Sequence, residues 1–383
     1  MDFDFSEEQR LLKESIERFL KDRYGFEQRR SHQSQPEGWS RAAWRSYAEL
    51  GLLGLPFEER HGGLGGGPVD TMIVMEAMGR ALALEPYLAT VVLAGGIVRH
   101  AGSDAQKSEL IPRIADCSLV LALAHGEQQS RFDLADVTTM ARKDGDRFWL
   151  IDGEKAVVLH GDSADRLIVS ARLSGKRRER GGIALFLVDA DARGVSRRGY
   201  PTVDGQRAAE IELLGVRVEE SDMIGAPGEA LPVIERVVDE AIAAVSAEAV
   251  GTMAVMHEMT LDYMKTRKQF GTTIGSFQAL QHRAVDMLVA LEQARSMAML
   301  ATMMAAEADA TGRRKAMSAA KVQIGRSIRF VGQQAIQLHG GIGMTEEYKV
   351  GHYFKRATVI DTLFGPADHH LALLAEAGGL IEP

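Results

Sequence analysis

Residues 337–370 read QLHGGIGMTEEYKVGHYFKRATVIDTLFGPADHH, a stretch in which glycine-bearing turns separate helical patterns. Upstream, from Arg314 to Leu338, apolar residues recur at spacings of three to four and predict a helix. His339-Gly340-Gly341 should end it, because glycine readily adopts the left-handed conformation of a C-cap. Further helices are predicted from about Glu346 to Gly365-Pro366 and from Ala367 onward. Helix starts at such turns can offer N–H groups to a phosphate, although two ordinary helix connections would give the same spacing.

Composition indicates an ordinary globular protein. The 383 residues are 45% hydrophobic and 26% charged, enough for two or three domains with real cores. Net charge is −8, and the basic run Lys176–Arg180 fits a solvated hairpin loop, so no nucleic-acid partner is expected. The single cysteine, Cys117, indicates a reducing compartment. No apolar run reaches spanning length and the first residues are unlike a signal peptide, so we expect a cytoplasmic protein without membrane contact.

The pattern before about residue 118 is helical. Ser6, which is followed by acidic residues, has the features of an N-cap and predicts that a helix starts there. Further helices are predicted at 44–50, from Val69 to Ala101 and at 105–114. The glycine-rich segment 58–67 is a weak phosphate-cradle signal, since no strand precedes it and no Gly-Lys-Ser/Thr follows.

From residue 119 to about 225 the periodicity changes to that of strands. Arg147–Ile151 and Lys155–Leu159 predict a hairpin with Asp152-Gly153 as its turn. Further strands are predicted at 119–124, 167–171, 183–188 and 209–216. No dinucleotide-binding glycine motif follows a first strand, so a Rossmann site is not expected.

Helical patterns return from about residue 230. They cover 230–266, 276–311, 314–338, 346–363 and 367–378, which predicts a four-helix bundle. The fold class is therefore α+β with segregated blocks: an N-terminal α-helical domain (1–118), a β-barrel-like middle domain (119–225) and a C-terminal helical bundle (226–383).

The glycine-bearing run resembles a motif of the acyl-CoA dehydrogenase family. In that family the pattern Q-x-x-G-G-x-G-[FY]-x-x-E-[YF] contacts the adenine dinucleotide of FAD held by the neighbouring subunit. A second run, with Arg267, Phe270 and Gln278, resembles the family pattern R-x-x-F-G-x-x-[IL]-x-x-[FL]-Q. Arginine suits a pyrophosphate because its planar fork donates two hydrogen bonds. The resemblance covers nearly the whole chain and implies cofactor contacts from Arg267, Phe270, Gln278, Gln337, Gly340 and Gly341.

The chain departs from the family pattern where the flavin ring and the chemistry would be. The family's catalytic glutamate, just before the glycine that matches Gly365, is replaced by Phe364. The loop T-E-P-G-A-G-S-D is replaced by residues 124–133, with two extra residues. The family's W-I-T-N-G is replaced by residues 157–161, so that Leu159 and His160 take the places beside the cofactor, as Asp368 does further on.

A different carboxylate could serve as base. Some relatives place the glutamate on the first long helix of the bundle, and alignment on Gly251 and Arg267 puts Ala241 at that position, with Glu240 beside it. Glu248 lies two turns further on the same face, among small apolar residues whose desolvation would favour the proton-accepting role. The alternative is a glutamate on a solvated face or one paired with an arginine. Glu248 is the candidate catalytic residue.

Two hypotheses follow from the resemblance. In the first, the chain is an FAD-dependent acyl-CoA dehydrogenase subunit of a homo- or hetero-tetramer, which oxidises an acyl-CoA from fatty acid or steroid side-chain degradation and reduces an electron-transfer flavoprotein. In the second, it is a catalytically silent partner that completes the FAD site of another chain. The small subunit of the heteromeric pimeloyl-CoA-type enzymes resembles it best. A flavin monooxygenase or acyl-CoA oxidase on the same fold stays open, and the scattered histidines predict no metal site.

Overall fold

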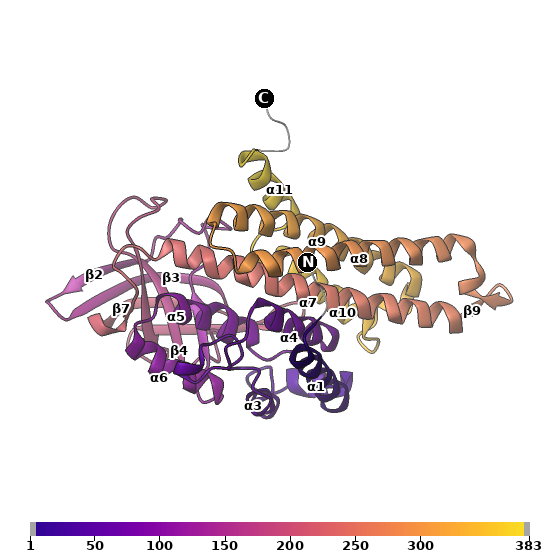
Figure 1. Cartoon of the computed structure of the whole chain (residues 1–383), viewed down its shortest axis with the longest axis horizontal. Coiled ribbons are helices and arrows are strands. Elements are labelled where there is room, and N and C mark those ends of the chain that lie inside the picture. The colour runs from indigo at the N-terminus through magenta and orange to yellow at the C-terminus, as the bar shows by residue number, and fades with distance from the viewer. Residues whose placement is uncertain (1–4, 379–383) are drawn as a thin grey trace. The chain divides into compact units, whose positions relative to one another are not determined.

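The computed structural model describes residues 5–378. Its helices lie at both ends of the sequence and its strands between them (Figure 1). Before the strands are α1 (Glu7–Arg23), α2 (Phe26–Gln33), α3 (Arg41–Glu49), η1 (Glu59–His61), α4 (Pro68–Ala81), η2 (Tyr87–Ala94), α5 (Gly95–Ala101) and α6 (Asp104–Ala115). After them are α7 (Leu231–Thr266), η4 (Ile274–Ser276), α8 (Gln278–Ala305), α9 (Ala310–His339), η5 (Gly340–Met344), α10 (Val350–Thr362) and α11 (Ala367–Glu376).

The chain forms two compact units. One contains residues 5–30, 68–83 and 242–378, and the other contains residues 31–67 and 84–241. Within residues 5–378, no helix is both long enough and apolar enough to span a bilayer.

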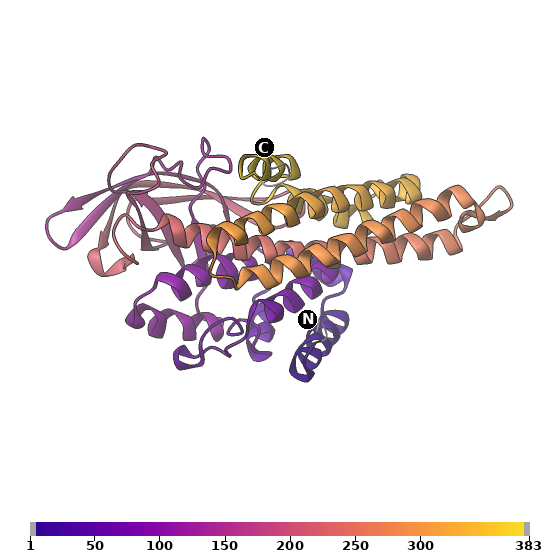
Figure 2. The ribbon, with the colours of Figure 1, turned by 45° about the horizontal axis from the view of Figure 1, so that its top comes forward.

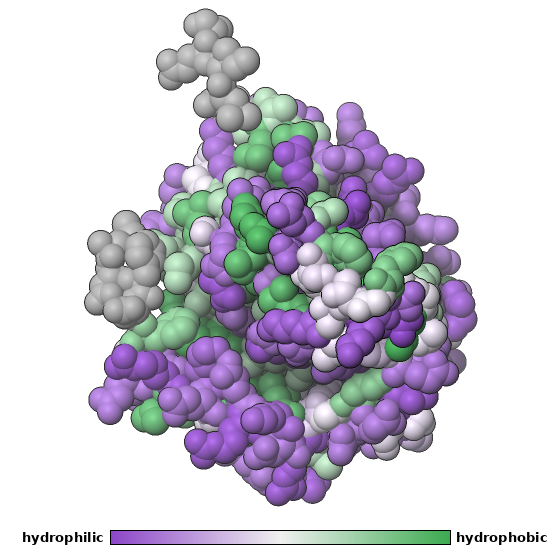
Figure 3. All heavy atoms as spheres, turned by 90° about the vertical axis from the view of Figure 1, so that its right-hand side faces the viewer, coloured by the Kyte–Doolittle hydropathy of each residue, from purple (hydrophilic) through white to green (hydrophobic). Residues whose placement is uncertain are grey.

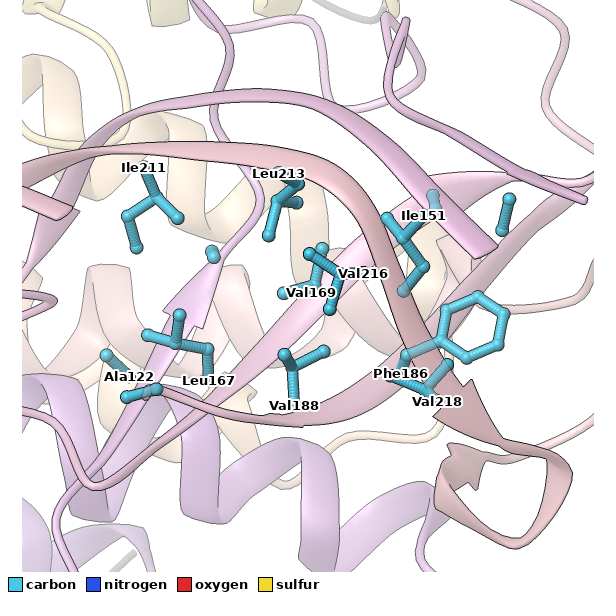
Figure 4. Packing of buried hydrophobic residues seen from close by; sticks show 14 of the residues in the cluster. Ala122, Ile151, Leu167, Val169, Phe186, Val188, Ile211, Leu213, Val216 and Val218 are labelled. Atoms are coloured by element: carbon cyan, nitrogen blue, oxygen red, sulfur yellow. The ribbon is translucent and has the colours of Figure 1, made fainter. Parts of the chain in front are cut away.

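The middle of the chain is an eight-stranded sheet. The strands are β1 (Leu121–Ala124), β2 (Met140–Asp144), β3 (Phe148–Leu159), β4 (Arg166–Arg172), β5 (Ile183–Asp189), β6 (Val195–Pro201), β7 (Arg207–Glu219) and β8 (Met223–Ile224). Their order is β6-β7-β3-β2-β4-β5-β8, and β1 pairs in parallel with β4. Figure 4 shows the core of this sheet, where side chains from several strands, among them Ile151, Val169, Phe186 and Leu213, point toward one another.

The predicted hairpin at Asp152-Gly153 is wrong. Residues 148–159 form one strand, β3, and the pairing register with β7 shifts between Ile151 and Gly153. Gly153 has φ +152°, and a Cβ there would lie 2.5 Å from Thr139 Oγ1. The glycine therefore admits a bulge rather than a turn. The turn that reverses the chain lies one strand earlier, between the antiparallel β2 and β3.

The predicted helix from Val69 to Ala101 is also interrupted. α4 ends at Ala81, and Leu82 has the left-handed φ of +54°. The carbonyl of Leu82 accepts a hydrogen bond from the buried Arg29 Nε at 2.8 Å. The chain resumes after Pro86 as a π-helix, η2, that leads directly into α5.

The other helix predictions agree with the structure to within a few residues. Ser6 and Ser103 each form a capping box, with Gln9 and Gln106, at the starts of α1 and α6. α9 ends at His339, where Gly340 takes φ +66°. α10 begins at Val350 rather than near Glu346, while α2, β2 and β6 were not predicted.

Candidate dinucleotide and proton-transfer sites

A short hairpin between α7 and α8 carries the first dinucleotide motif. β9 (Lys268–Gln269) pairs with β10 (Thr272–Thr273), and Phe270 and Gly271 form its turn with φ of +53° and +81°. The Phe270 ring is 91% exposed, and Arg267 is exposed beside it. The hairpin projects beyond the ends of α7 and α8 (Figures 1 and 2), and α8 and α9 run side by side in both views.

The second motif lies where α9 ends. Gln337 is exposed, and a Cβ added at Gly340 or Gly341 would meet nothing within 4 Å, so this turn is open to a ligand. The two motifs belong to the same compact unit. Tyr263, one turn before Arg267, stacks on His339 with ring centroids 4.7 Å apart, which joins the end of α7 to the end of α9.

The residues of this region suit a dinucleotide. An exposed guanidinium can donate to a pyrophosphate, an exposed aromatic ring can stack on a base, and two bare glycines let a ligand approach the backbone. Gln278, the first residue of α8, is exposed and adds an amide. Figure 3, which views the end of the molecule bearing β9, shows apolar surface interspersed with hydrophilic side chains, a mixed surface of the kind that ligands and protein partners use.

The turn after α10 holds an aromatic residue where the family resemblance places the base. Phe364 has φ +59° and Gly365 has φ +109°. The Phe364 carbonyl accepts from His370 Nε2 at 3.0 Å, and the buried Lys321 Nζ donates to the carbonyls of Ile360 and Asp361 at 2.8 and 3.2 Å. The turn is firmly held, but Phe364 cannot accept a proton from a substrate.

Burial explains the charge states around this turn. Burial, together with the nearby Lys321, lowers the pKa of His370 to about 4. Burial also lowers the pKa of Lys321 to about 8. Asp368, in the first turn of α11, is exposed.

Leu159 and His160 lie at the end of β3, in the other compact unit. His160 has φ +52° and is buried, and its Nε2 lies 3.1 Å from Gln206 Oε1. Its ring also contacts Trp39 edge-on, with ring centroids 6.5 Å apart. The imidazole is thus committed to contacts inside its own unit.

Glu248 is buried, as the sequence indicates, but it is paired. Its two carboxylate oxygens accept from Arg356 Nε at 2.6 Å and Arg356 Nη2 at 2.7 Å, a bidentate pair between α7 and α10. Both side chains are less than a tenth exposed. This geometry is the arginine-paired alternative, and a base role for Glu248 remains a prediction.

Tight helix contacts enclose this ion pair. A Cβ at Gly79 would lie 2.1 Å from the Glu248 carbonyl oxygen, and one at Gly251 would lie 2.0 Å from the Glu76 carbonyl oxygen. The Tyr353 hydroxyl donates to the Arg80 carbonyl on α4. Helices α4, α7 and α10 are therefore packed directly against one another around Glu248.

Comparison with known proteins gives the family. Family models for the N-terminal, middle and C-terminal domains of acyl-CoA dehydrogenases match residues 6–118, 122–216 and 231–379. The chain belongs to the acyl-CoA dehydrogenase family. Its members are flavoproteins and oxidoreductases that act on CH–CH bonds.

Individual relatives span nearly the whole chain. FadE12 of Mycobacterium tuberculosis is 30% identical over 351 residues, which cover 90% of this chain and 89% of that protein. A variant of the Tcur3481-Tcur3483 steroid ACAD is 30% identical with a TM-score of 0.86, over 97% of each chain. The ChsE4-ChsE5 complex of Mycobacterium tuberculosis is 24% identical with a TM-score of 0.88, over 100% of each chain, and shows the shared fold.

Two buried, paired cations, Arg356 and Lys155, were not predicted. Arg356 could have been found from its spacing, because it falls on the same helical face as the buried Tyr353 and Ile360. Lys155 occupies an inward-facing position of β3, a charged residue where the strand pattern expects an apolar one. Within residues 5–378, no group of three His, Cys, Asp or Glu side chains is placed to hold a metal ion.

Proposed function

We propose that this chain is a subunit of an FAD-dependent acyl-CoA dehydrogenase assembly in which another chain supplies the catalytic base. The observation that carries this proposal is the absence of a free carboxylate at either candidate base position among the described residues. Phe364 occupies one position, and Glu248, near the other, is held by Arg356. A carboxylate that accepts two hydrogen bonds from a buried guanidinium is a poor proton acceptor, because protonating it would leave the arginine unpaired.

The dinucleotide motifs, in contrast, are open. Arg267 would hold the pyrophosphate, Phe270 would stack on the adenine, and Gln337, Gly340 and Gly341 would line the same stretch of FAD. FAD, when bound, supplies the acceptor for the hydride that leaves the β-carbon of the acyl group. The protein's part is to bind and orient, and the electrons would leave through an electron-transfer flavoprotein.

The relatives point to a substrate class and a mode of assembly. One similar solved structure is described as a steroid acyl-CoA dehydrogenase, and another is a complex of two named chains. We therefore propose an acyl-CoA thioester with a steroid side chain or a dicarboxylic chain as substrate, and a hetero-tetramer as the working form. The compartment proposed is the cytoplasm, where Cys117 stays a free thiol.

The test is the visible spectrum of the protein expressed alone and then co-expressed with a second acyl-CoA dehydrogenase chain. The proposal expects the lone chain to be colourless or weakly coloured and the co-expressed assembly to be yellow and bleached by an acyl-CoA. A lone chain that carries FAD and is bleached by acyl-CoA would overturn the silent-subunit assignment.

The second candidate is a self-sufficient dehydrogenase with Glu248 as base. The burial of Glu248 on α7 favours it, since a base must be shielded from water. This candidate requires the Arg356 contact to break when substrate binds. A Glu248→Gln variant that stays folded, keeps FAD and loses flavin bleaching would establish it.

A further inference from the structure

The ammonium group of Lys155 is buried inside the compact unit of residues 31–67 and 84–241, which we call the β unit. The residue is 1% exposed on β3, and its side chain reaches three acceptors. Nζ lies 2.7 Å from Glu127 Oε1, 3.0 Å from Ser170 Oγ and 3.3 Å from the His125 carbonyl oxygen. Three protons on the ammonium meet three acceptors, so the group is fully satisfied at one position.

Glu127 links Lys155 to the loop that follows β1. Its Oε2 accepts from the Thr138 backbone N–H at 2.7 Å and from Thr138 Oγ1 at 2.5 Å, and its Oε1 accepts from the Thr139 N–H at 3.0 Å. One carboxylate therefore ties the start of segment 125–139 to its end. Lys155 provides the only cation paired with it among the described side chains.

Ser170 and His125 form a second connection from the same lysine. Because Ser170 Oγ accepts from Lys155, its proton is free for His125 Nδ1, which lies 2.9 Å away. The imidazole is then neutral and its other nitrogen faces the Leu134 carbonyl. Burial, with the adjacent Lys155, lowers the pKa of His125 to about 3, so the neutral ring persists at physiological pH.

The segment that Lys155 anchors lies against the end of β3. The Ala156 N–H donates to the Gly126 carbonyl at 2.8 Å. Directly after Lys155 the register of β3 shifts, and Val157 turns outward with φ +53° and 56% exposure. Segment 125–139 therefore lies beside the end of β3, where Val157 is exposed and His160 is buried.

We propose that Lys155 is a positioning residue, which through Glu127, Ser170 and His125 fixes segment 125–139 against the end of β3, so that both present a rigid wall to the acyl-CoA and the flavin. The inference rests on the proposed function for the identity of the ligand, because the family resemblance assigns this loop to the flavin edge and the CoA. The contacts that Lys155 makes with Glu127, Ser170 and His125, which we call the lock, lie within the β unit and do not depend on the identity of the ligand.

The lock has a predictable pH dependence. Burial lowers the pKa of Lys155 to about 8, against the pull of Glu127, whereas an opened loop would return the amine toward its ordinary value of 10.5. The other charged groups nearby include Arg172, Asp136 and the two arginines paired with Asp136, Arg177 and Arg178. The arginines stay charged, and the Arg177 contact lowers the pKa of Asp136 to about 2.

Proton linkage gives the direction of this pH dependence. Between pH 8 and 10.5 the open loop holds a proton that the closed loop has lost, so closing releases a proton and is favoured as pH rises. Protection of the loop should therefore increase through this window. Because burial of the amine causes this gain, Lys155→Met should lack it.

The first arm of the test is amide hydrogen exchange of residues 126–139, referred to intrinsic exchange rates, in the wild type, Lys155→Met and the double variant Glu127→Gln/Lys155→Met. The matched control is Lys143→Met, which removes an exposed lysine from the neighbouring strand β2. We expect Lys155→Met to lose protection on the order of tenfold or more, as when one hydrogen bond to a charged group is lost.

The double variant should regain part of this protection, because no unpaired charge stays buried. The wild type, and not Lys155→Met, should gain protection between pH 8 and 10. Equal protection of residues 126–139 in Lys155→Met and the wild type would overturn the lock.

The second arm measures binding of free CoA and of FAD to the same proteins, alone and co-expressed with the partner chain. We expect Lys155→Met to weaken the binding of at least one of them on the order of tenfold, while Lys143→Met binds as the wild type does. Lost protection with unchanged binding would overturn the positioning role. A wild type that binds neither ligand in either form would overturn the proposed function, and the exchange arm would still report on the lock.

Discussion

Two buried carboxylates are each paired with a cation, yet they are held in different ways. Glu248 lies in the helical unit (residues 5–30, 68–83 and 242–378), and Glu127 lies in the β unit. Arg356 covers both oxygens of Glu248 with two hydrogen bonds and joins two helices far apart in sequence. Lys155 covers one oxygen of Glu127, and backbone and hydroxyl donors of the following loop cover the rest. Glu248 is held by its arginine partner, whereas Glu127 binds its lysine partner and also several donors of the loop that follows.

The difference teaches how to read a buried glutamate. Burial alone suggests a catalytic base, but a base needs a carboxylate that can take a proton without breaking a better contact. Glu248 has a bidentate guanidinium, and Glu127 has an ammonium that holds its pKa well below the ordinary range, helped by Thr138. Both carboxylates are engaged by a buried cation, and both connect separate elements of the fold.

The largest expected effect comes from removing the arginine of the first pair. Arg356→Met leaves Glu248 as an uncompensated buried charge and should lower the free energy of unfolding by about 3–5 kcal/mol. Urea denaturation measures it. Glu258→Ala is the control, because its exposed pair with Arg80 should contribute only about 0–1 kcal/mol.

The double variant Glu248→Leu/Arg356→Met refines this prediction. It removes both charges together, so most of the lost stability should return. If Arg356→Met were as stable as Glu258→Ala, the view of the pair as a structural junction would be wrong.

The helix contact behind Glu248 can be broken without touching a charge. Gly79→Ala places a methyl group 2.1 Å from the Glu248 carbonyl oxygen, so α4 and α7 must separate. We expect a loss of about 1–3 kcal/mol in the free energy of unfolding, the usual result of overpacking. Gly181→Ala, where an added Cβ meets nothing within 4 Å, should be close to neutral. Equal unfolding midpoints for the two variants would contradict the close helix contact.

Removing the cation of the second pair should cost less stability than removing Arg356. In Lys155→Met the Glu127 carboxylate keeps its donors from Thr138 and Thr139, so we expect a loss of about 1–3 kcal/mol in the free energy of unfolding. The lysine pKa is depressed in the folded protein, so the wild type should gain more stability than the variant as pH rises from about 8 toward 10.5, because the variant keeps only the similarly depressed Lys321. Unfolding curves at several pH values check both statements. A Lys155→Met loss as large as that of Arg356→Met would remove the distinction between the pairs.

The smallest effect on folding, but a clear one on binding, is expected outside both pairs. Arg267→Ala removes an exposed guanidinium that the fold does not need, so stability should hardly change. FAD affinity of the assembly should fall about 10- to 100-fold, as expected for one charge-assisted hydrogen bond. Lys268→Ala, the neighbouring exposed cation, is the control in the same titration of flavin fluorescence. Equal affinities of the two variants would place the pyrophosphate elsewhere.

The sequence predicted the segregated fold and most helix boundaries, because periodicity, capping residues and glycine turns are local signals. It failed where a tertiary contact decides. Asp152-Gly153 has the composition of a turn, but pairing with β7 keeps β3 continuous and makes it a bulge. Leu82 looks helical, but its left-handed backbone ends α4.

The site shows the same division. The helix end and glycine turn at Gly340 follow from local sequence. The partner of Glu248 does not, because Arg356 lies 108 residues away and only helix packing brings it near. Lys155 was overlooked for the same reason, since three of its contacts come from other segments of the chain.

The central claim, that this chain binds part of the cofactor but supplies no base, is tested most directly by adding an acyl-CoA of the proposed substrate class anaerobically to the lone protein in the presence of excess FAD. The visible flavin absorbance of wild type and of a folded Glu248→Gln variant should then stay the same, and bleaching should appear only when the second chain is present. Bleaching of the lone wild type, lost in Glu248→Gln with FAD still bound, would contradict the account and make Glu248 the base.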